Sequence, residues 1–147
     1  MMKRKTTEVA VAVVMLILGG AVYLLFRTKQ LIMFHVTDAL GLTDTIDSWR
    51  KTTADIKLPE WSVYVLPNAL WAGAYVIVTD AILQSHRRTI RLMAASIIPL
   101  LGIMAEIMQA AGLIPGTFDW LDIMAYALPY IIYIIYTTST KSQEICN

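Results

Sequence analysis

Cysteine, histidine and charged residues are all scarce in this sequence of 147 residues, and each shortage excludes a class of site or protein. The single cysteine, Cys146, excludes an intrachain disulfide and a metal cage built from cysteines. The two histidines, His35 and His86, lie far apart and form no histidine metal motif. A phosphate-binding loop and the nucleophile turn of serine hydrolases are also missing. The residue types therefore give little support to an enzyme.

Charged residues make up 16% of the chain, against about 25% in a soluble domain. The formal net charge is +1 at pH 7. Nucleic-acid-binding domains carry a clear excess of Lys and Arg. We therefore expect no nucleic-acid partner.

Hydrophobic residues are abundant, at 57% of the chain against about 45–50% in soluble domains. They gather in four runs, each close to or above the roughly 17–25 residues that an α-helix needs to cross a membrane. The sequence therefore predicts an all-α fold, an integral membrane four-helix bundle with a single membrane domain over residues 1–147. We expect the first helix to be a retained anchor rather than a cleaved signal peptide, because bulky residues stand where cleavage would fall. The transmembrane helices are expected at about 8–26, 62–83, 92–112 and 119–137.

Basic residues predict the orientation, because Lys and Arg collect on the cytoplasmic side of membrane proteins. They stand before the first run, between the second and third, and after the fourth: Lys3, Arg4, Lys5, Arg87, Arg88, Arg91 and Lys141. The turn at 112–117 carries none. We expect a multi-pass protein of the inner (cytoplasmic) membrane, with membrane lipids as partners, both termini cytoplasmic and the turn at 112–117 outside. Asp80 is expected to form an ion pair with Arg87 or Arg88.

The outer connection, residues 27–60, mixes apolar and polar residues. The apolar ones recur at roughly helical intervals: Leu31, Phe34, Leu40, Leu42, Ile46 and Trp49. Such a segment can lie along the membrane interface with its apolar face down. A solvated loop that touches the helix ends is an equally favoured hypothesis.

Five polar residues are expected to converge at the outer ends of the last three helices. Glu106 lies about 9 Å below the turn that follows it, at roughly 1.5 Å per helical residue. Gln109 shares its face, Asn68 lies near the outer start of its helix, and Asp119 and Asp122 open the last helix. We interpret these residues as a candidate ligand-binding site.

Most of these residues also have a structural interpretation. Asp119 is well placed as a helix N-cap, and Asp122 in the first turn favours the positive end of the helix dipole. Asn68 and Gln109 are as well explained as fasteners between helices. Glu106 differs, because placing a charge within the membrane costs about 2.5–3.5 kcal/mol on insertion scales. A charge kept there usually marks a functional site.

The spacing Glu106-x-x-Gln109, a short Pro-Gly turn and Asp119-x-x-Asp122 at the start of a helix resembles the signature of the VanZ-like membrane proteins. That family is named for a teicoplanin-resistance protein. The four-helix layout and the aromatic stretch WSVYVLPNALW are similar to the family as well. The resemblance covers roughly the second to fourth helices.

The resemblance implies a bacterial cell-envelope protein linked to glycopeptide tolerance, with no defined reaction. Two positions depart from the family pattern. The family tends to carry an arginine three residues before the first aspartate, where this chain has Gly116. It also favours an asparagine four residues after the second, where Tyr126 stands.

Three functions are compatible with this pattern. The first is a VanZ-like envelope protein whose outward acidic pocket takes a cation, an amine or a lipid head group, because carboxylates and amides suit hard cations. If a divalent cation is the cofactor, its expected ligands are Glu106, Asp119 and Asp122; no other cofactor is expected. The second is a channel or membrane-disrupting effector in which a homo-oligomer lines a pore. The third and weakest is a membrane-embedded hydrolase with Glu106 and an aspartate as acid and base.

Overall fold

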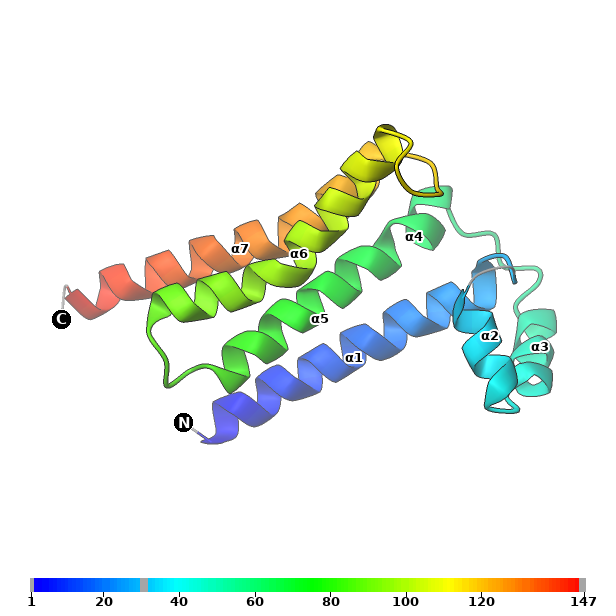
Figure 1. Cartoon of the computed structure of the whole chain (residues 1–147). Helices are drawn as coiled ribbons and strands as arrows, with labels where there is room; N and C mark the ends of the chain where they lie inside the picture. Colours follow the sequence, from blue (N-terminus) through cyan, green and yellow to red (C-terminus); the bar gives the residue numbers. More distant parts are fainter. Residues whose placement is uncertain (1, 30–31, 146–147) are drawn as a thin grey trace.

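The computed structural model describes residues 2–29 and 32–145, and these form seven α-helices and no strand (Figure 1). The helices are α1 (Met2–Phe26), α2 (Ile32–Ala39), α3 (Thr43–Thr52), α4 (Glu60–Tyr64), α5 (Leu66–Ile82), α6 (Arg88–Ala110) and α7 (Trp120–Ile145). The predicted all-α class is confirmed. Leu31 and Cys146 lie outside the described residues, as do the side chains of Lys3, Arg4 and Lys141.

Among the described residues, three helices are long and apolar enough to cross a membrane: Lys5–Phe26 in α1, Arg88–Ala110 in α6 and Trp120–Ser139 in α7. Their presence supports a membrane protein. The fourth predicted span, 62–83, corresponds to α5, which has 17 residues and is not among the three. A fourth crossing therefore stays a prediction.

Pro67 explains why the expected second span is divided. A proline has no N–H to bond the carbonyl four residues earlier, and its ring crowds that carbonyl. The helix accordingly breaks at Val65, between α4 and α5. The break is slight, because the Val65 amide still donates to the Trp61 carbonyl at 2.9 Å and the Val65 carbonyl accepts from Ala69 at 3.2 Å. Helical structure thus continues from residue 60 to residue 82.

The four long helices alternate in direction and lie side by side (Figure 1). α5 is the central helix, because α1, α6 and α7 all pack against it. Its buried positions are mostly small, and include Ala72, Gly73, Ala74 and Ala81. Small residues let helix backbones approach closely where no hydrophobic effect drives helices together.

The two ends of this bundle differ (Figure 1). One end, here termed the terminal end, carries both chain termini and the turn between α5 and α6. The other, the loop end, carries α2, α3, α4 and the turn between α6 and α7. Both termini thus share one end, as expected for four crossings. The side of the membrane that each end faces stays a prediction.

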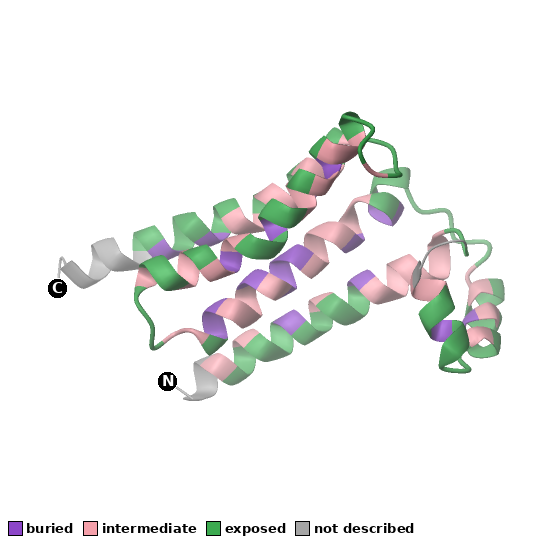
Figure 2. Cartoon of the chain, viewed as in Figure 1, coloured by how far each residue is buried: buried purple, intermediate pink, exposed green. Residues whose placement is uncertain are grey.

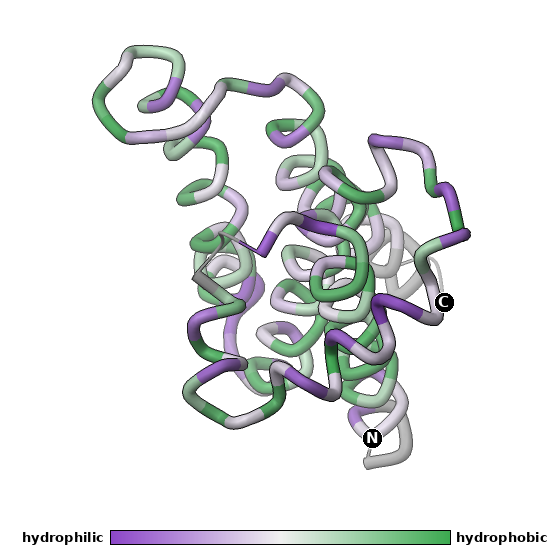
Figure 3. Tube along the Cα trace, turned by 90° about the vertical axis from the view of Figure 1, so that its right-hand side faces the viewer, coloured by the Kyte–Doolittle hydropathy of each residue, from purple (hydrophilic) through white to green (hydrophobic). Residues whose placement is uncertain are grey.

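Apolar side chains cover the outer surfaces of the long helices, where Figure 2 shows extended exposed stretches. Ile17 on α1 is 64% exposed, Met93 on α6 is 67% exposed and Ile135 on α7 is 60% exposed. Figure 3 shows hydrophobic residues along the helices and hydrophilic ones mainly in the connections. An apolar exterior is what a lipid environment requires of a spanning helix.

Two tyrosines bind backbone carbonyls of α6 in the turns that precede Pro99. The Tyr75 hydroxyl donates to the Ala94 carbonyl at 2.8 Å, and the Tyr130 hydroxyl donates to the Leu92 carbonyl at 3.0 Å. Pro99 is buried at the middle of α6 and removes the helical donor of the Ala95 carbonyl. The two tyrosines bond other carbonyls of the same turns and so tie α5 and α7 to α6.

The outer connection is largely helical, with α2 and α3 joined to the end of α1. The Arg50 guanidinium donates to the Leu24 carbonyl at 2.6 Å. The Lys29 ammonium bonds Asp47 at 2.6 Å, and this hydrogen bond holds the pKa of the Asp47 carboxyl below its usual value. The segment touches the end of α1, as the solvated-loop hypothesis expects, but α2 and α3 give it helical structure. Its position along a membrane interface stays a prediction.

Candidate functional site

Asn68, Glu106, Asp119 and Asp122 come together at the loop end, from α5, α6 and the start of α7. The Asn68 side-chain amide donates to Oδ1 of Asp122 at 2.9 Å. The Asp119 backbone amide donates to Oε2 of Glu106 at 3.1 Å. Depth counting along the helices thus placed these four residues at the correct level. They are termed the loop-end cluster below.

Glu106 is the most enclosed member of the loop-end cluster, at 6% exposed. Its acceptor role is structural in part, because the amide that it binds belongs to Asp119, directly before α7. Helix starts leave backbone N–H groups without partners inside the helix. Glu106 satisfies one such group from the neighbouring helix and so holds the α6–α7 turn closed.

Asp119 caps α7, as the sequence predicts. Its Oδ1 atom accepts a hydrogen bond of 2.8 Å from the Leu121 amide, the usual interaction of an N-cap aspartate. Asp122 lies in the first turn of α7, also as expected. Its bond to Asn68 supports the interpretation of Asn68 as a fastener between helices. The cluster therefore has a packing role whatever else it does.

Gln109 lies beside the cluster and packs against the α6–α7 turn. A Cβ atom added to Gly116 would come within 2.6 Å of the Gln109 Cδ atom. Gly116 also has φ = +140°, a backbone conformation that side-chain-bearing residues rarely adopt. The position where the VanZ-like family tends to carry an arginine thus admits no side chain here unless Gln109 moves.

Arg27, directly after α1, is a cation at the loop end that the sequence did not suggest for the site. Its guanidinium lies over the rings of Tyr23 and Tyr64, 5.2 Å and 4.9 Å from their centres. Its Nε atom is buried and has no hydrogen-bond partner within the described part of the chain. Tyr23 belongs to α1 and Tyr64 to α4, so Arg27 lies where these two helices meet.

A sequence signal for Arg27 exists, although it is weak. Arg27 is the first charged residue after the long apolar run of α1, and an aromatic residue precedes it by four positions. Only the packing of α1 against α4 and α5 shows that it lies at the loop end, over the Tyr64 ring.

The expected metal ligands do not form a ready metal site. Among the described residues, no group of three or more His, Cys, Asp or Glu side chains is placed to hold a metal ion. Glu106 and Asp122 bond different partners, one at the turn and one on α5. The cluster consists of two neighbouring polar pairs, Asn68–Asp122 and Glu106–Asp119, and not of a metal coordination sphere.

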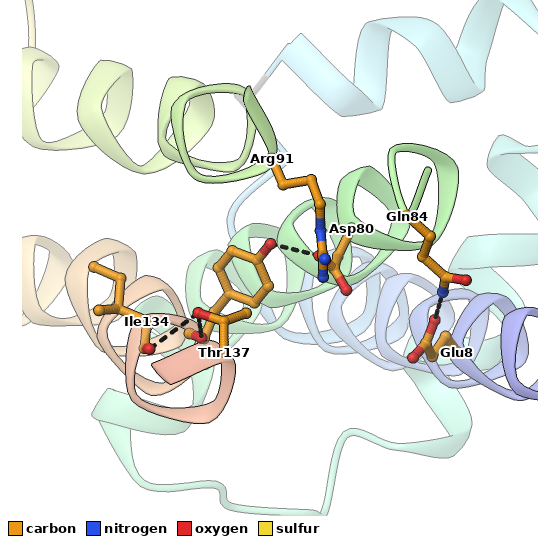
Figure 4. A network of polar contacts seen from close by, with 7 residues as sticks. Glu8, Asp80, Gln84, Arg91, Ile134 and Thr137 are labelled. Carbon is orange, nitrogen blue, oxygen red and sulfur yellow. Dashed lines mark hydrogen bonds and ion pairs between the residues drawn. The ribbon is translucent and has the colours of Figure 1, made fainter. Parts of the chain in front are cut away.

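A second polar cluster lies at the terminal end (Figure 4). Asp80, which is 5% exposed, accepts a hydrogen bond of 2.7 Å from Nε of Arg91 and another from the Tyr133 hydroxyl. The prediction that Asp80 pairs with Arg87 or Arg88 is therefore wrong. Helix α6 begins at Arg88, so Arg91 is the arginine one turn inside the bundle, level with Asp80. Arg88 bonds the Thr138 hydroxyl at 2.7 Å instead.

The fold and these clusters define a helical membrane protein with charged groups gathered at both ends of its bundle. No family model, curated protein or solved structure matches the chain.

Proposed function

We propose that this chain is a VanZ-like cell-envelope protein of the inner membrane, and that its loop-end cluster binds a cation, an amine or a lipid head group that carries one. The observation that carries the proposal is the burial of Glu106, 6% exposed, within a helix apolar enough to cross a membrane. Such a charge is costly in lipid, and charged residues kept within spanning helices are usually functional.

Charge balance at the loop end favours a positively charged ligand. Glu106, Asp119 and Asp122 supply three carboxylates, and Arg27 is a cation at the same end of the bundle. Carboxylates close together in a poorly solvated site repel one another, and a bound cation relieves that repulsion. An ammonium group or a hard divalent cation suits carboxylate and amide oxygens. A bare phosphate does not.

Arg27 supplies a positive charge at the loop end from outside the motif. Its guanidinium lies over the Tyr64 ring of α4. An arginine at position 116 would first have to displace Gln109. The missing arginine of the motif therefore does not leave the loop end without a cation.

The proposed membrane arrangement has four crossings, with α4 and α5 together as the fourth. The basic residues at the terminal end support a cytoplasmic position for that end. The loop end then faces the outside of the cell. A ligand would reach the cluster from the outer leaflet or from the space beyond it.

Thermal unfolding of the protein in detergent micelles tests the proposal, with ethanolamine and Mg²⁺ as separate probes. At least one probe is expected to raise the Tm of the native chain in a concentration-dependent way, because a ligand that binds only the folded state stabilises it. Glu106→Gln and Asp122→Asn should abolish this rise. Asp44→Asn, which changes an exposed carboxylate on α3, is the matched control and should keep it. An equal rise in all four proteins, or none with the native chain, would overturn the proposal.

A further inference from the structure

We propose that the groove between α1, α5 and α7 holds a hydrocarbon chain of a membrane lipid. The groove has a volume of about 510 Å³, within the range of small-molecule sites. Its walls are largely apolar and include Val11 and Met15 of α1, Val76 and Ile77 of α5, and Ile132 of α7. It lies in the half of the bundle nearer the terminal end, apart from the loop-end cluster.

Helix packing gives the groove a closed end and an open end. Gly73 of α5 forms part of its floor. A Cβ atom added there would lie 2.6 Å from Met15 of α1 and 3.6 Å from Pro129 of α7. The side chains of both walls therefore meet over Gly73 and close the groove on that side. Towards the terminal end no lining glycine brings the two walls together in this way. The lining there continues to Glu8 and Tyr136.

The polarity of the lining changes along the groove. Thr7, Glu8 and Tyr136 lie at its terminal end, and Glu8 accepts a hydrogen bond of 2.6 Å from Gln84 (Figure 4). The side walls near this mouth include Asp80 and Tyr133, which bond each other. An apolar channel with a polar mouth at the end of a membrane helix matches an amphiphile, with its chain inside and its head group at the interface.

The length and the apolar lining of the groove suit a hydrocarbon chain. The lining spans nine residues of α7, from Leu128 to Tyr136, or about 12 Å at 1.5 Å per residue. A methylene chain fits, because carbon atoms pack about 4 Å apart.

The surroundings of the groove identify the source of the chain. Its two walls, α1 and α7, are both helices that are apolar enough to cross a membrane. The opening between them therefore faces lipid. Apolar walls without contacting atoms lose dispersion energy, and a lipid chain restores those contacts.

Native mass spectrometry tests this proposal on protein reconstituted in vesicles and released in detergent. Ile132→Trp fills the groove, and Ile131→Trp adds the same bulk at a 48% exposed position outside it. The native chain and Ile131→Trp should each retain a bound lipid, and Ile132→Trp should retain at least about tenfold less, a change of about 1.4 kcal/mol in binding free energy. Equal retention by both variants would overturn the proposal.

A second matched pair protects the test from a folding defect. Val11→Trp enters the groove from α1, whereas Val13→Trp lies outside it, and the two positions are 46% and 45% exposed.

Phosphatidylethanolamine and phosphatidylglycerol vesicles with identical chains distinguish the head groups. Retention of both lipids supports a site for the hydrocarbon chain. Retention of only one also supports such a site, and shows in addition that the mouth of the groove recognises the head group. Retention of neither, or a dimer in place of a lipid adduct, contradicts it.

Discussion

The side-chain amide of Asn68 donates a hydrogen bond of 2.9 Å to Asp122, 54 positions further along the chain. This bond joins α5 to α7 at the loop end. The Tyr133 hydroxyl joins the same two helices at the terminal end through its bond to Asp80. α5 and α7 are thus fastened near both ends, and one buried or half-buried aspartate of each cluster, Asp80 and Asp122, lies on this frame.

Asn68→Ala should destabilise the protein by about 1 kcal/mol, because polar contacts between membrane helices average about 0.6 kcal/mol and reach about 1.7 kcal/mol. Unfolding by sodium dodecyl sulfate from mixed micelles measures the change. A double-mutant cycle with Asp122→Ala isolates the pair. A coupling energy of zero would show that the two side chains do not stabilise each other.

Arg91→Met should lower the free energy of unfolding by about 3–5 kcal/mol, because it leaves the buried Asp80 carboxylate without its cation. Arg87→Met, at an exposed position before α6, should change it by less than about 0.5 kcal/mol. The same detergent unfolding assay compares them. Similar losses for the two variants would mean that the arginines act as a general surface charge.

Gly116→Ala should be more damaging than Gly112→Ala, although both glycines have a positive φ. Alanine at 112 meets open space and costs only backbone strain, about 1–2 kcal/mol. Alanine at 116 must also displace Gln109, so we expect about twice the loss of stability. The measurement is the Tm of thermal unfolding of each variant, compared with the Tm of the native chain. Equal losses would show that Gln109 moves aside without cost.

Arg27→Gln should strengthen binding of ethanolamine or Mg²⁺ at the loop end by about tenfold, or about 1.4 kcal/mol, because it removes a positive charge from the same end of the bundle. Arg27→Lys keeps the charge and should leave affinity within about twofold of the native value. Ligand-dependent Tm shifts report both. Weaker binding by Arg27→Gln would mean that Arg27 contacts the ligand instead of competing with it.

The sequence predicted the long helices well, since apolar runs of membrane length have few alternatives to a helix. It also predicted the level of the loop-end residues, because depth follows from counting along a regular helix. It missed the division at Val65, where one proline changes the start of α5. The predicted third helix began too late, because the polar residues at its start, from Arg88 onward, are helical as well.

Contacts between distant helices were the least predictable part. Three arginines follow Asp80 within eleven positions, and only the register of α5 against α6 selects Arg91. Arg27 lies over the Tyr64 ring because α1 and α4 meet at the loop end. The groove at Gly73 depends on the shapes of three helices together. None of these relationships has a local sequence pattern.

Labelling of intact cells with a membrane-impermeant maleimide tests the arrangement on which the account depends. Single cysteines at Thr117, in the α6–α7 turn, and at Ser85, in the α5–α6 turn, are introduced in a Cys146→Ser background. Four crossings with cytoplasmic termini predict that the cysteine at 117 reacts and the cysteine at 85 does not. If α5 fails to cross, the pattern reverses, with 85 labelled and 117 protected. That result would place the loop-end cluster on the cytoplasmic side and contradict the proposed outward site.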